Sequence, residues 1–564
     1  MKPYKIILPL IFLLALVGCT KNFEDINKDP NAITADEASA RYFITVPQFK
    51  LFAPDRYPYW RIHLIHCDRF AGQFLFGHNY SWWNDGLGYS YNSAYTDAGW
   101  DFLAGYFGQL DNFLKLTAPG GDFENEYMYA VGLIMKGMYY QMYTDVFGEI
   151  PYSEAGDPDI LLPKFDTQMD IYKGIIADLD AAMATIGSAT RTGDGVDDLG
   201  VNDIYCQGDL QQWKRMANTL KLRIAMRALG APGNDFSTNA IAQALGAPLL
   251  SGASDNILME KDNVISQWTS AAYSDVWQNF GDAAGWTLGK ELVDYMRDNN
   301  DPRLPKYAKP AKGGTFTFVR PASGSDYDLF PKRVDYMEQV LTDAGAVVTR
   351  VDNGDQVTMG IEANKYYIGQ PVRLNGFIKP LVRMEFFCTP ADEIYAKKGT
   401  GQKIREELVM SSAEASFLKA EAIVRGLTGG NAQAEFEAGI TSAMKLWGVA
   451  DGAIATYIAD EDLADITGGT TDEKLEKIAV QRWIAAYTDG FEAWAIVRKT
   501  GYPASLAAGV ADFDIYAPGD INGVYPERLK YGTSAYSQNG ANLNIAIGRQ
   551  GPDDMDTKLW FSKP

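Results

Sequence analysis

Residues 209–228, DLQQWKRMANTLKLRIAMRA, are the stretch that decides the fold class. Its apolar side chains recur every three or four positions: Trp213, Ala217, Leu220, Ile224 and Ala228. This period predicts an amphipathic helix with one face turned to a core. Asp209 is suited to cap the helix, with Gln212 three residues later, and Gly230 and Pro232 mark its end.

The same helical period returns in seven further segments. They are 101–116, 124–147, 166–187, 412–425, 431–447, 472–488 and 490–499. For 412–425, Ser411 and Glu414 offer a capping box. Together with 209–228 the segments group as four antiparallel pairs, in two regions at about 101–230 and 412–499. The 412–447 hairpin has about the 34-residue length of a tetratricopeptide unit.

Between these regions, from about 231 to 410, helical period weakens and Gly, Pro, Asp and Asn become frequent. A short helical piece covers 285–297, and TFTFVR at 315–320 and AVVTRV at 346–351 are typical of short strands. The sequence therefore predicts a mostly α fold. Its scaffold would be tetratricopeptide-like helical pairs, carrying a long irregular insertion that contains short strands.

The N-terminus has the layout of a secretory signal over residues 1–18. Lys2 and Lys5 precede the apolar run IILPLIFLLALV, which is too short for a membrane span of about 20 residues. The tetrad LVGC, ending at Cys19, resembles a bacterial lipobox, whose cysteine receives diacylglycerol. The alternative is an ordinary secretory signal followed by an incidental cysteine. We expect Cys19 to be lipidated and residues 19–40 to form a tether.

Composition narrows the class of partner. The formal net charge is −21, and nucleic-acid binding needs a basic surface, so we expect no nucleic-acid partner. No C-x-x-C pair occurs among the four cysteines. If lipid occupies Cys19, the remaining three allow at most one disulfide.

Two groups of residues have the side chains of a metal site. His63 and His66 stand three positions apart, which suits a metal on a helix, but no carboxylate partner is evident and a structural role is favoured. The acidic loop with Asp194, Asp197, Asp198 and Asp203 lacks the spacing of a calcium loop, so a solvated surface loop is favoured. We therefore predict neither a metal site nor a cofactor.

Several motifs resemble one known family along nearly the whole chain. They include TDVFGEIPYSEA at 144–155, PKFDTQ at 163–168, NTLKLR at 218–223, DPR at 301–303, QRW at 481–483, EAW at 492–494 and TKLW at 557–560. In content and order these resemble the SusD/RagB family of nutrient-binding outer-membrane lipoproteins. On physical grounds we interpret Asp145 and Gly148 as turn formers, and Arg223, Arg227 and Arg498 as ties between scaffold elements.

The resemblance implies the fold unit and the function. It implies a single SusD-like domain over residues 41–564, anchored by lipid on the outer face of the outer membrane. It further implies that the protein is not an enzyme. Members bind an oligosaccharide, or in some cases a peptide, and deliver it to a SusC-like TonB-dependent transporter.

Two stretches have the side chains that a sugar site needs, namely flat aromatic rings beside amides and carboxylates. They are 78–100, with a loop-like composition, and 266–289, inside the insertion. The candidate ligand residues are Tyr80, Trp82, Trp83, Asn84, Asp85, Trp268, Tyr273, Trp277, Asn279 and Trp286. Two alternatives stay open: these aromatics pack inside the protein, or they face the transporter.

Two rival functions also remain at this point. A glycoside hydrolase would use a pair of carboxylates, and the 72 Asp and Glu residues are too many for their number to discriminate. No G-x-S-x-G, H-E-x-x-H or phosphate-binding loop motif in a suitable context is present, and we predict no catalytic residue. The other rival is a structural surface lipoprotein without a small ligand.

Overall fold

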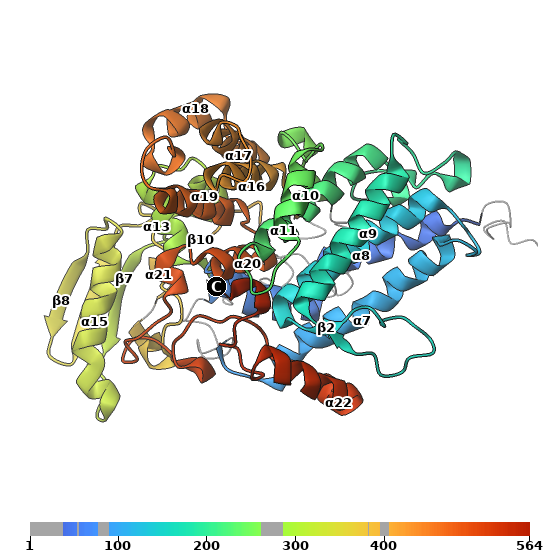
Figure 1. Cartoon of the computed structure of the whole chain (residues 1–564). Coiled ribbons are helices and arrows are strands. Elements are labelled where there is room, and N and C mark those ends of the chain that lie inside the picture. Colours follow the sequence, from blue (N-terminus) through green and yellow to red (C-terminus); the bar gives the residue numbers. More distant parts are fainter. Residues whose placement is uncertain are drawn as a thin grey trace, which may run out of the picture.

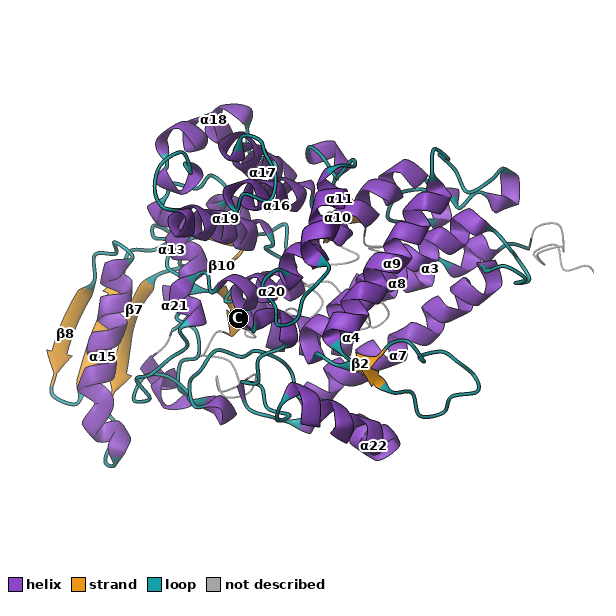
Figure 2. Cartoon of the chain, viewed as in Figure 1, coloured by secondary structure: helices purple, strands orange, loops and turns teal. Residues whose placement is uncertain are grey.

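The computed structural model describes residues 38–52, 56–76, 89–260, 286–381, 383–394 and 405–563. Helices make up most of this part, and the strands are short (Figure 2). The prediction of a mostly helical scaffold with short strands in the insertion is therefore confirmed.

The first group of helices lies side by side on the right of Figure 1. It comprises α7 (Ser93–Thr117), α8 (Glu126–Phe147), α9 (Gln168–Ile186), α10 (Leu210–Ala228) and α11 (Ser237–Leu245). Short polar side chains fix where the long helices begin, because Asn92, Asn125, Thr167 and Asp209 each accept a hydrogen bond from a first-turn backbone N–H. The capping role expected of Asp209 is thus confirmed, while α7 begins eight residues before the predicted 101–116 segment.

The second group lies at the top and centre of Figure 1. It comprises α16 (Ser412–Val424), α17 (Ala432–Leu446), α18 (Asp451–Asp460), α19 (Thr471–Ala485) and α20 (Gly490–Thr500). Here α16 packs on α17 and α19 on α20, as the pairing predicted, whereas α18 was not predicted. The two groups meet where α10 contacts α16 and α8 contacts α20.

The insertion is more regular than its composition suggested. Helix α15 (Ser325–Asp343) covers one face of a three-stranded antiparallel sheet in the order β7 (Gly314–Val319), β9 (Gln356–Ile361), β8 (Thr349–Asn353) (Figure 1). Phe330, Val334 and Met337 of α15 join a separate core with side chains of the sheet. The expectation of an irregular segment was wrong here, since Pro331 and the flanking glycines concealed a helix whose apolar face is complete only against the sheet.

Other elements close the structure. Two-stranded ribbons are formed by β1 (Phe74–Phe76) with β5 (Trp286–Leu288), by β4 (Ile257–Met259) with β11 (Glu407–Met410), by β6 (Ala308–Lys309) with β10 (Thr389–Pro390) and by β2 (Ile150–Pro151) with β3 (Phe165–Asp166). Helix α13 (Lys290–Asp298) follows β5 directly, and α22 (Thr533–Gln550), not predicted, lies near the C-terminus. Within the described ranges, no helix combines the length and apolarity needed to cross a membrane.

Candidate ligand-binding site

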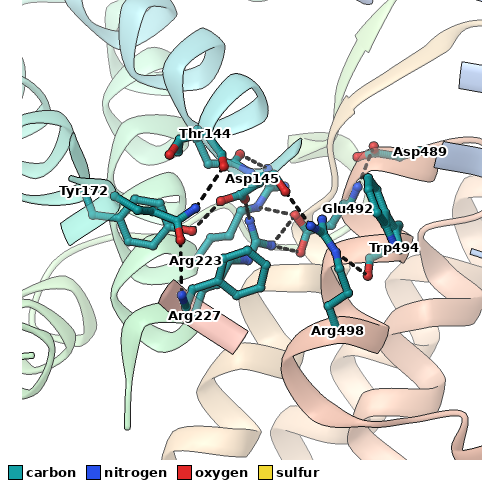
Figure 3. A network of polar contacts seen from close by, with 12 residues as sticks. Thr144, Asp145, Tyr172, Arg223, Arg227, Asp489, Glu492, Trp494 and Arg498 are labelled. Atoms are coloured by element: carbon teal, nitrogen blue, oxygen red, sulfur yellow. Dashed lines mark hydrogen bonds and ion pairs between the residues drawn. The ribbon is translucent and has the colours of Figure 1, made fainter. Parts of the chain in front are cut away.

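The motif residues of the scaffold meet in one buried polar network (Figure 3). Arg227 of α10 donates hydrogen bonds to Asp145 of α8 and to both carboxylate oxygens of Glu492 on α20. Asp145 also accepts from the Tyr172 hydroxyl of α9, and from Gln141 Nε2 at 2.6 Å. Because these groups are almost fully buried, each charge needs its partner, and the network holds the two helical groups together.

Three further arginines extend the network, two of them to α16 and one to the backbone at Glu527. Arg223 Nε donates to Glu414 of α16 at 2.7 Å, and Arg482 of α19 donates to Glu421 at 3.1 Å. Arg498 donates to the backbone carbonyl of Glu527 at 3.0 Å. The expectation that Arg223, Arg227 and Arg498 tie scaffold elements together is confirmed.

Two local interpretations within these motifs were wrong. Asp145 does not form a turn, because it lies in the last turn of α8 with its carboxylate buried among Arg227 and Tyr172. Glu414 does not complete a capping box, because its carboxylate is bonded to Arg223 and Ser411 alone accepts from the helix start. Gly148 does end α8, with a φ of 86° that suits glycine. The carboxylates of Asp145 and Glu414 thus bond to arginines from other helices rather than to nearby backbone.

The network also perturbs two carboxyl groups in opposite directions. Burial would raise the pKa of Glu492, but the charges of Arg227 and Arg223 outweigh it and lower the pKa to about 2. Burial raises the pKa of Asp489 to about 7, against the opposing effect of Arg223. The two cavities beside these carboxyls have volumes of only about 20 and 10 Å³, which suits single water molecules rather than a sugar. This pair therefore has a structural role and forms no site for a glycan.

Most of the predicted ligand residues lie outside the described residues. Tyr80, Trp82, Trp83, Asn84 and Asp85 fall in 77–88, and Trp268, Tyr273, Trp277 and Asn279 fall in 261–285.

Trp286 is described, as the first residue of β5. It is 2% exposed and belongs to the main core, so its ring is not open to a ligand in this conformation. The end of the first stretch also differs from the expected loop, because Tyr89 is buried and residues from Ser93 belong to α7.

The structure brings together two strands, one next to each of these stretches. Strands β1 and β5 are antiparallel, and Phe76 is the register partner of Trp286. Residue 77 comes directly after Phe76, and residue 285 comes directly before Trp286. These two strand residues are opposite each other at the same end of the ribbon. Two stretches far apart in the sequence are thereby attached side by side.

The ribbon itself is held firmly from the side. Thr287 Oγ1 donates to Gln370 Oε1 at 2.8 Å, and Leu288 N donates to the carbonyl oxygen of Cys388 at 3.1 Å. Gly289 allows the closest approach, because a Cβ there would stand 1.8 Å from the carbonyl oxygen of Gly72. The attachment of both stretches is therefore a rigid part of the fold.

Tyr89 anchors the other end of the first stretch. Two guanidinium groups lie over its ring, that of Arg69 at 5.2 Å and that of Arg373 at 4.2 Å from the centroid. Arg373 in turn donates to the carbonyl oxygens of Gly523 and Val524 at 2.9 and 2.7 Å. Tyr89 and the segment that follows it are therefore fixed to the core.

The residues weighed as metal ligands have structural roles. His66 is fully buried, its Nδ1 lies 2.6 Å from the Arg61 carbonyl oxygen, and burial lowers its pKa to about 4. His63 stacks on Tyr59, with ring centroids 4.5 Å apart. Cys67, Cys206 and Cys388 are buried free thiols. Across the described ranges, no group of three or more His, Cys, Asp or Glu is placed to hold a metal ion.

The acidic loop is only partly a solvated loop, and for Asp203 that expectation was wrong. Asp203 is fully buried, and its carboxylate accepts from Gln48 Nε2 at 2.6 Å, Trp213 Nε1 at 2.7 Å and Gly208 N at 2.9 Å. It therefore joins the N-terminal segment to the start of α10. One feature of the sequence could have indicated this burial: Asp203 lies shortly before the helix that Asp209 caps, and that helix carries the inward-facing Trp213.

Comparison with known proteins identifies the family. A family model described as starch-binding and associating with the outer membrane matches residues 73–343 and 361–532, which is most of the chain. The chain belongs to the SusD-like family. Several of its motif residues, among them Asp145, Arg223 and Glu492, are members of the buried network.

Solved structures of SusD-like proteins share the fold. A chitin-binding protein is 24% identical with a TM-score of 0.69, and 93% of this chain covers 100% of that one. A SusD-like protein from Bacteroides thetaiotaomicron is 22% identical with a TM-score of 0.66, over 93% and 98% of the two chains. A SusD homologue from Bacteroides uniformis is 20% identical with a TM-score of 0.69, over 93% and 100%. Among curated protein sequences, none matches the chain.

Proposed function

We propose that this SusD-like protein is a surface lipoprotein that captures an oligosaccharide and delivers it to a SusC-like TonB-dependent transporter. The observation that carries the proposal is the Phe76–Trp286 register pair, which attaches the two aromatic-rich stretches side by side on a rigid ribbon. Rings and amides offered from two neighbouring stretches suit the apolar faces and hydroxyl edges of a sugar chain.

Three further features support this proposal. The family is described as starch-binding and associating with the outer membrane. A protein with the same fold is described as chitin-binding. The lipobox at Cys19 and the tether to residue 40 would place the domain at a membrane surface while leaving it free to meet a transporter.

The ligand stretches are proposed as Tyr80, Trp82, Trp83, Asn84 and Asp85 from the first, and Trp268, Tyr273, Trp277 and Asn279 from the second. We propose that the protein returns its ligand unchanged, since the family that it belongs to is described as binding. The buried carboxyls Asp489 and Glu492 line cavities of about 20 and 10 Å³, which are too small for a glycan. A peptide is the second candidate ligand, since the same aromatic and polar mixture would bind it.

A thermal-shift screen tests the proposal. The mature chain carrying Cys19→Ser is melted with each of a panel of glycans and peptides, because a ligand that binds only the folded state raises Tm. A glycan that raises Tm and is recovered intact is the expected result. A peptide hit would replace the oligosaccharide, a cleaved glycan would mean an enzyme, and no shift with any compound would favour a structural or transporter-dependent role.

A further inference from the structure

A cleft lies on the helical scaffold, and the β1–β5 ribbon does not line it. It is a cleft of about 500 Å³ between the end of α13 and the start of α19, closed by the loop that connects α18 to α19. Its size is in the usual range of about 300–1,000 Å³ for small-molecule sites. Neither ribbon strand contributes a lining residue among the described part of the chain.

The cleft has an apolar side. Its lining includes the buried side chains of Leu463 and Val480 and the half-buried ring of Tyr295. That ring makes an edge-to-face contact with Trp483, with centroids 6.4 Å apart. A flat supported ring beside aliphatic side chains is the surface on which a sugar ring stacks.

The rest of the lining is polar, and part of it is already engaged in internal bonds. The Lys477 ammonium is already engaged, because it donates to the carbonyl oxygen of Asp465 at 2.9 Å and pairs with Asp462 at 2.9 Å. Lys474 and Glu476 also line or border the cleft, and in the described part of the chain their charged groups form no hydrogen bond or ion pair. These two side chains can reach a ligand without first breaking an internal bond.

The connecting loop is held in place. Thr470 and Glu473 form a capping box at the start of α19. Asn300, just after α13, donates to the Glu461 carboxylate at 2.8 Å and so links the two sides of the cleft. The cleft is therefore largely formed before any ligand arrives, which lowers the ordering cost of binding.

We propose that this cleft is a second binding site, for a neutral oligosaccharide. Lys474 and Lys477 stand against four acidic lining residues, Asp462, Asp465, Glu473 and Glu476, so the site does not favour an anion. An apolar wall edged by amide, ammonium and carboxylate groups fits a ligand that has apolar faces and many hydroxyls but no charge. The proposal shares its ligand class with the proposed function but does not depend on the aromatic stretches.

Calorimetric titration of the mature chain carrying Cys19→Ser, with maltoheptaose and with chitohexaose, tests the cleft. Two variants remove it: Tyr295→Ala, and the double substitution Lys474→Ala with Glu476→Gln, which spares the packing on Trp483. The control is Asp460→Asn, an exposed residue of α18 that is not part of the cleft lining. Thermal melts confirm that each variant is folded.

The expected result is two equivalents of at least one glycan. One equivalent weakens about tenfold or more in both cleft variants and is retained in Trp82→Ala with Trp83→Ala and in the control. A single equivalent that depends on the cleft and not on the tryptophans would support the cleft and overturn the aromatic stretches. A single equivalent indifferent to both cleft variants would overturn the cleft alone. No binding of either glycan would also overturn it, and the peptide arm of the thermal-shift screen would then judge the proposed function separately.

Discussion

The guanidinium of Arg227 donates to the carboxylate of Glu492, which lies 265 residues further along the chain. This single contact joins α10 of the first helical group to α20 of the second. Both side chains are buried, at 4% exposure each, so water does not solvate either charge. Together with Arg223–Glu414 and the packing of α8 on α20, it joins the two runs of helical pairs into one scaffold.

Removing one partner of this pair should be costly. Arg227→Met leaves Glu492 and Asp145 with less compensation, and we expect the free energy of unfolding to fall by about 3–5 kcal/mol. Denaturant unfolding measures it. The control is Lys365→Met, which removes an exposed pair with Glu362 and should change stability little. A loss as small as that of the control would contradict the role given to the network.

Asp489 should make stability fall as the pH rises. Its pKa is raised from 3.8 to about 7, so the folded state holds a proton that the unfolded state releases from about pH 4 upward. Stability is therefore fully present below about pH 4 and declines until about pH 7. The carboxyl faces Arg223, Glu492 and Glu414, and it borders water-sized cavities.

Asp489→Asn keeps a side-chain oxygen to accept from the Glu492 N–H, a contact of 3.2 Å, but cannot titrate. The free energy of unfolding of the variant, measured relative to that of the wild type, should rise by about 2–4 kcal/mol from pH 4 to pH 7. The buried His66, with its pKa lowered to about 4, acts in the opposite direction but is common to both proteins. Parallel stability curves across this window would show that Asp489 is ionised throughout.

Gly289 should be intolerant of a methyl group. Its φ is an ordinary −67°, so only space is at issue, and a Cβ would overlap the Gly72 carbonyl. Gly289→Ala should cost about 3 kcal/mol or more in thermal or denaturant unfolding. The matched control is Gly105→Ala on α7, where a Cβ meets nothing within 4 Å and should stabilise by about 0.5–1 kcal/mol. Equal changes in stability at the two sites would contradict a steric overlap at Gly289.

Trp82→Ala with Trp83→Ala should weaken glycan capture without unfolding the protein. Loss of a central aromatic should cost about 2 kcal/mol or more of binding free energy, measured by calorimetry. Tyr42→Ala with Phe43→Ala is the control, since these neighbouring aromatics are 40% and 42% exposed elsewhere on the surface. Unchanged affinity in the tryptophan variant would remove the first stretch from the site.

Cys19→Ser should release the protein from the membrane fraction. The substitution removes the thiol that would carry diacylglycerol, and the lipid chains are what would hold the protein at the membrane. Cell fractionation and incorporation of a labelled fatty acid provide the measurement. A variant that stays membrane-bound to the same extent as the wild type would contradict lipid anchoring.

The amino-acid sequence alone was enough for the helical pairs, because period and capping are local properties that Asp209 and the stripe ending at Ala228 express within a few turns. It was also enough for the family, which the match of the family model over residues 73–343 and 361–532 confirms. It was not enough for α15, since Pro331 and flanking glycines argue against a helix until the sheet supplies the other half of its core.

Only the tertiary structure decided what the motif residues do and which distant segments meet. Local pattern placed Asp145 in a turn and Glu414 in a capping box, but Arg227 and Arg223 lie within reach only after the helices pack. The same holds for Phe76 beside Trp286, and for the cleft between Tyr295 and Glu476. Local pattern records what a residue offers its near neighbours along the chain, whereas burial and long-range pairing are properties of the folded chain as a whole.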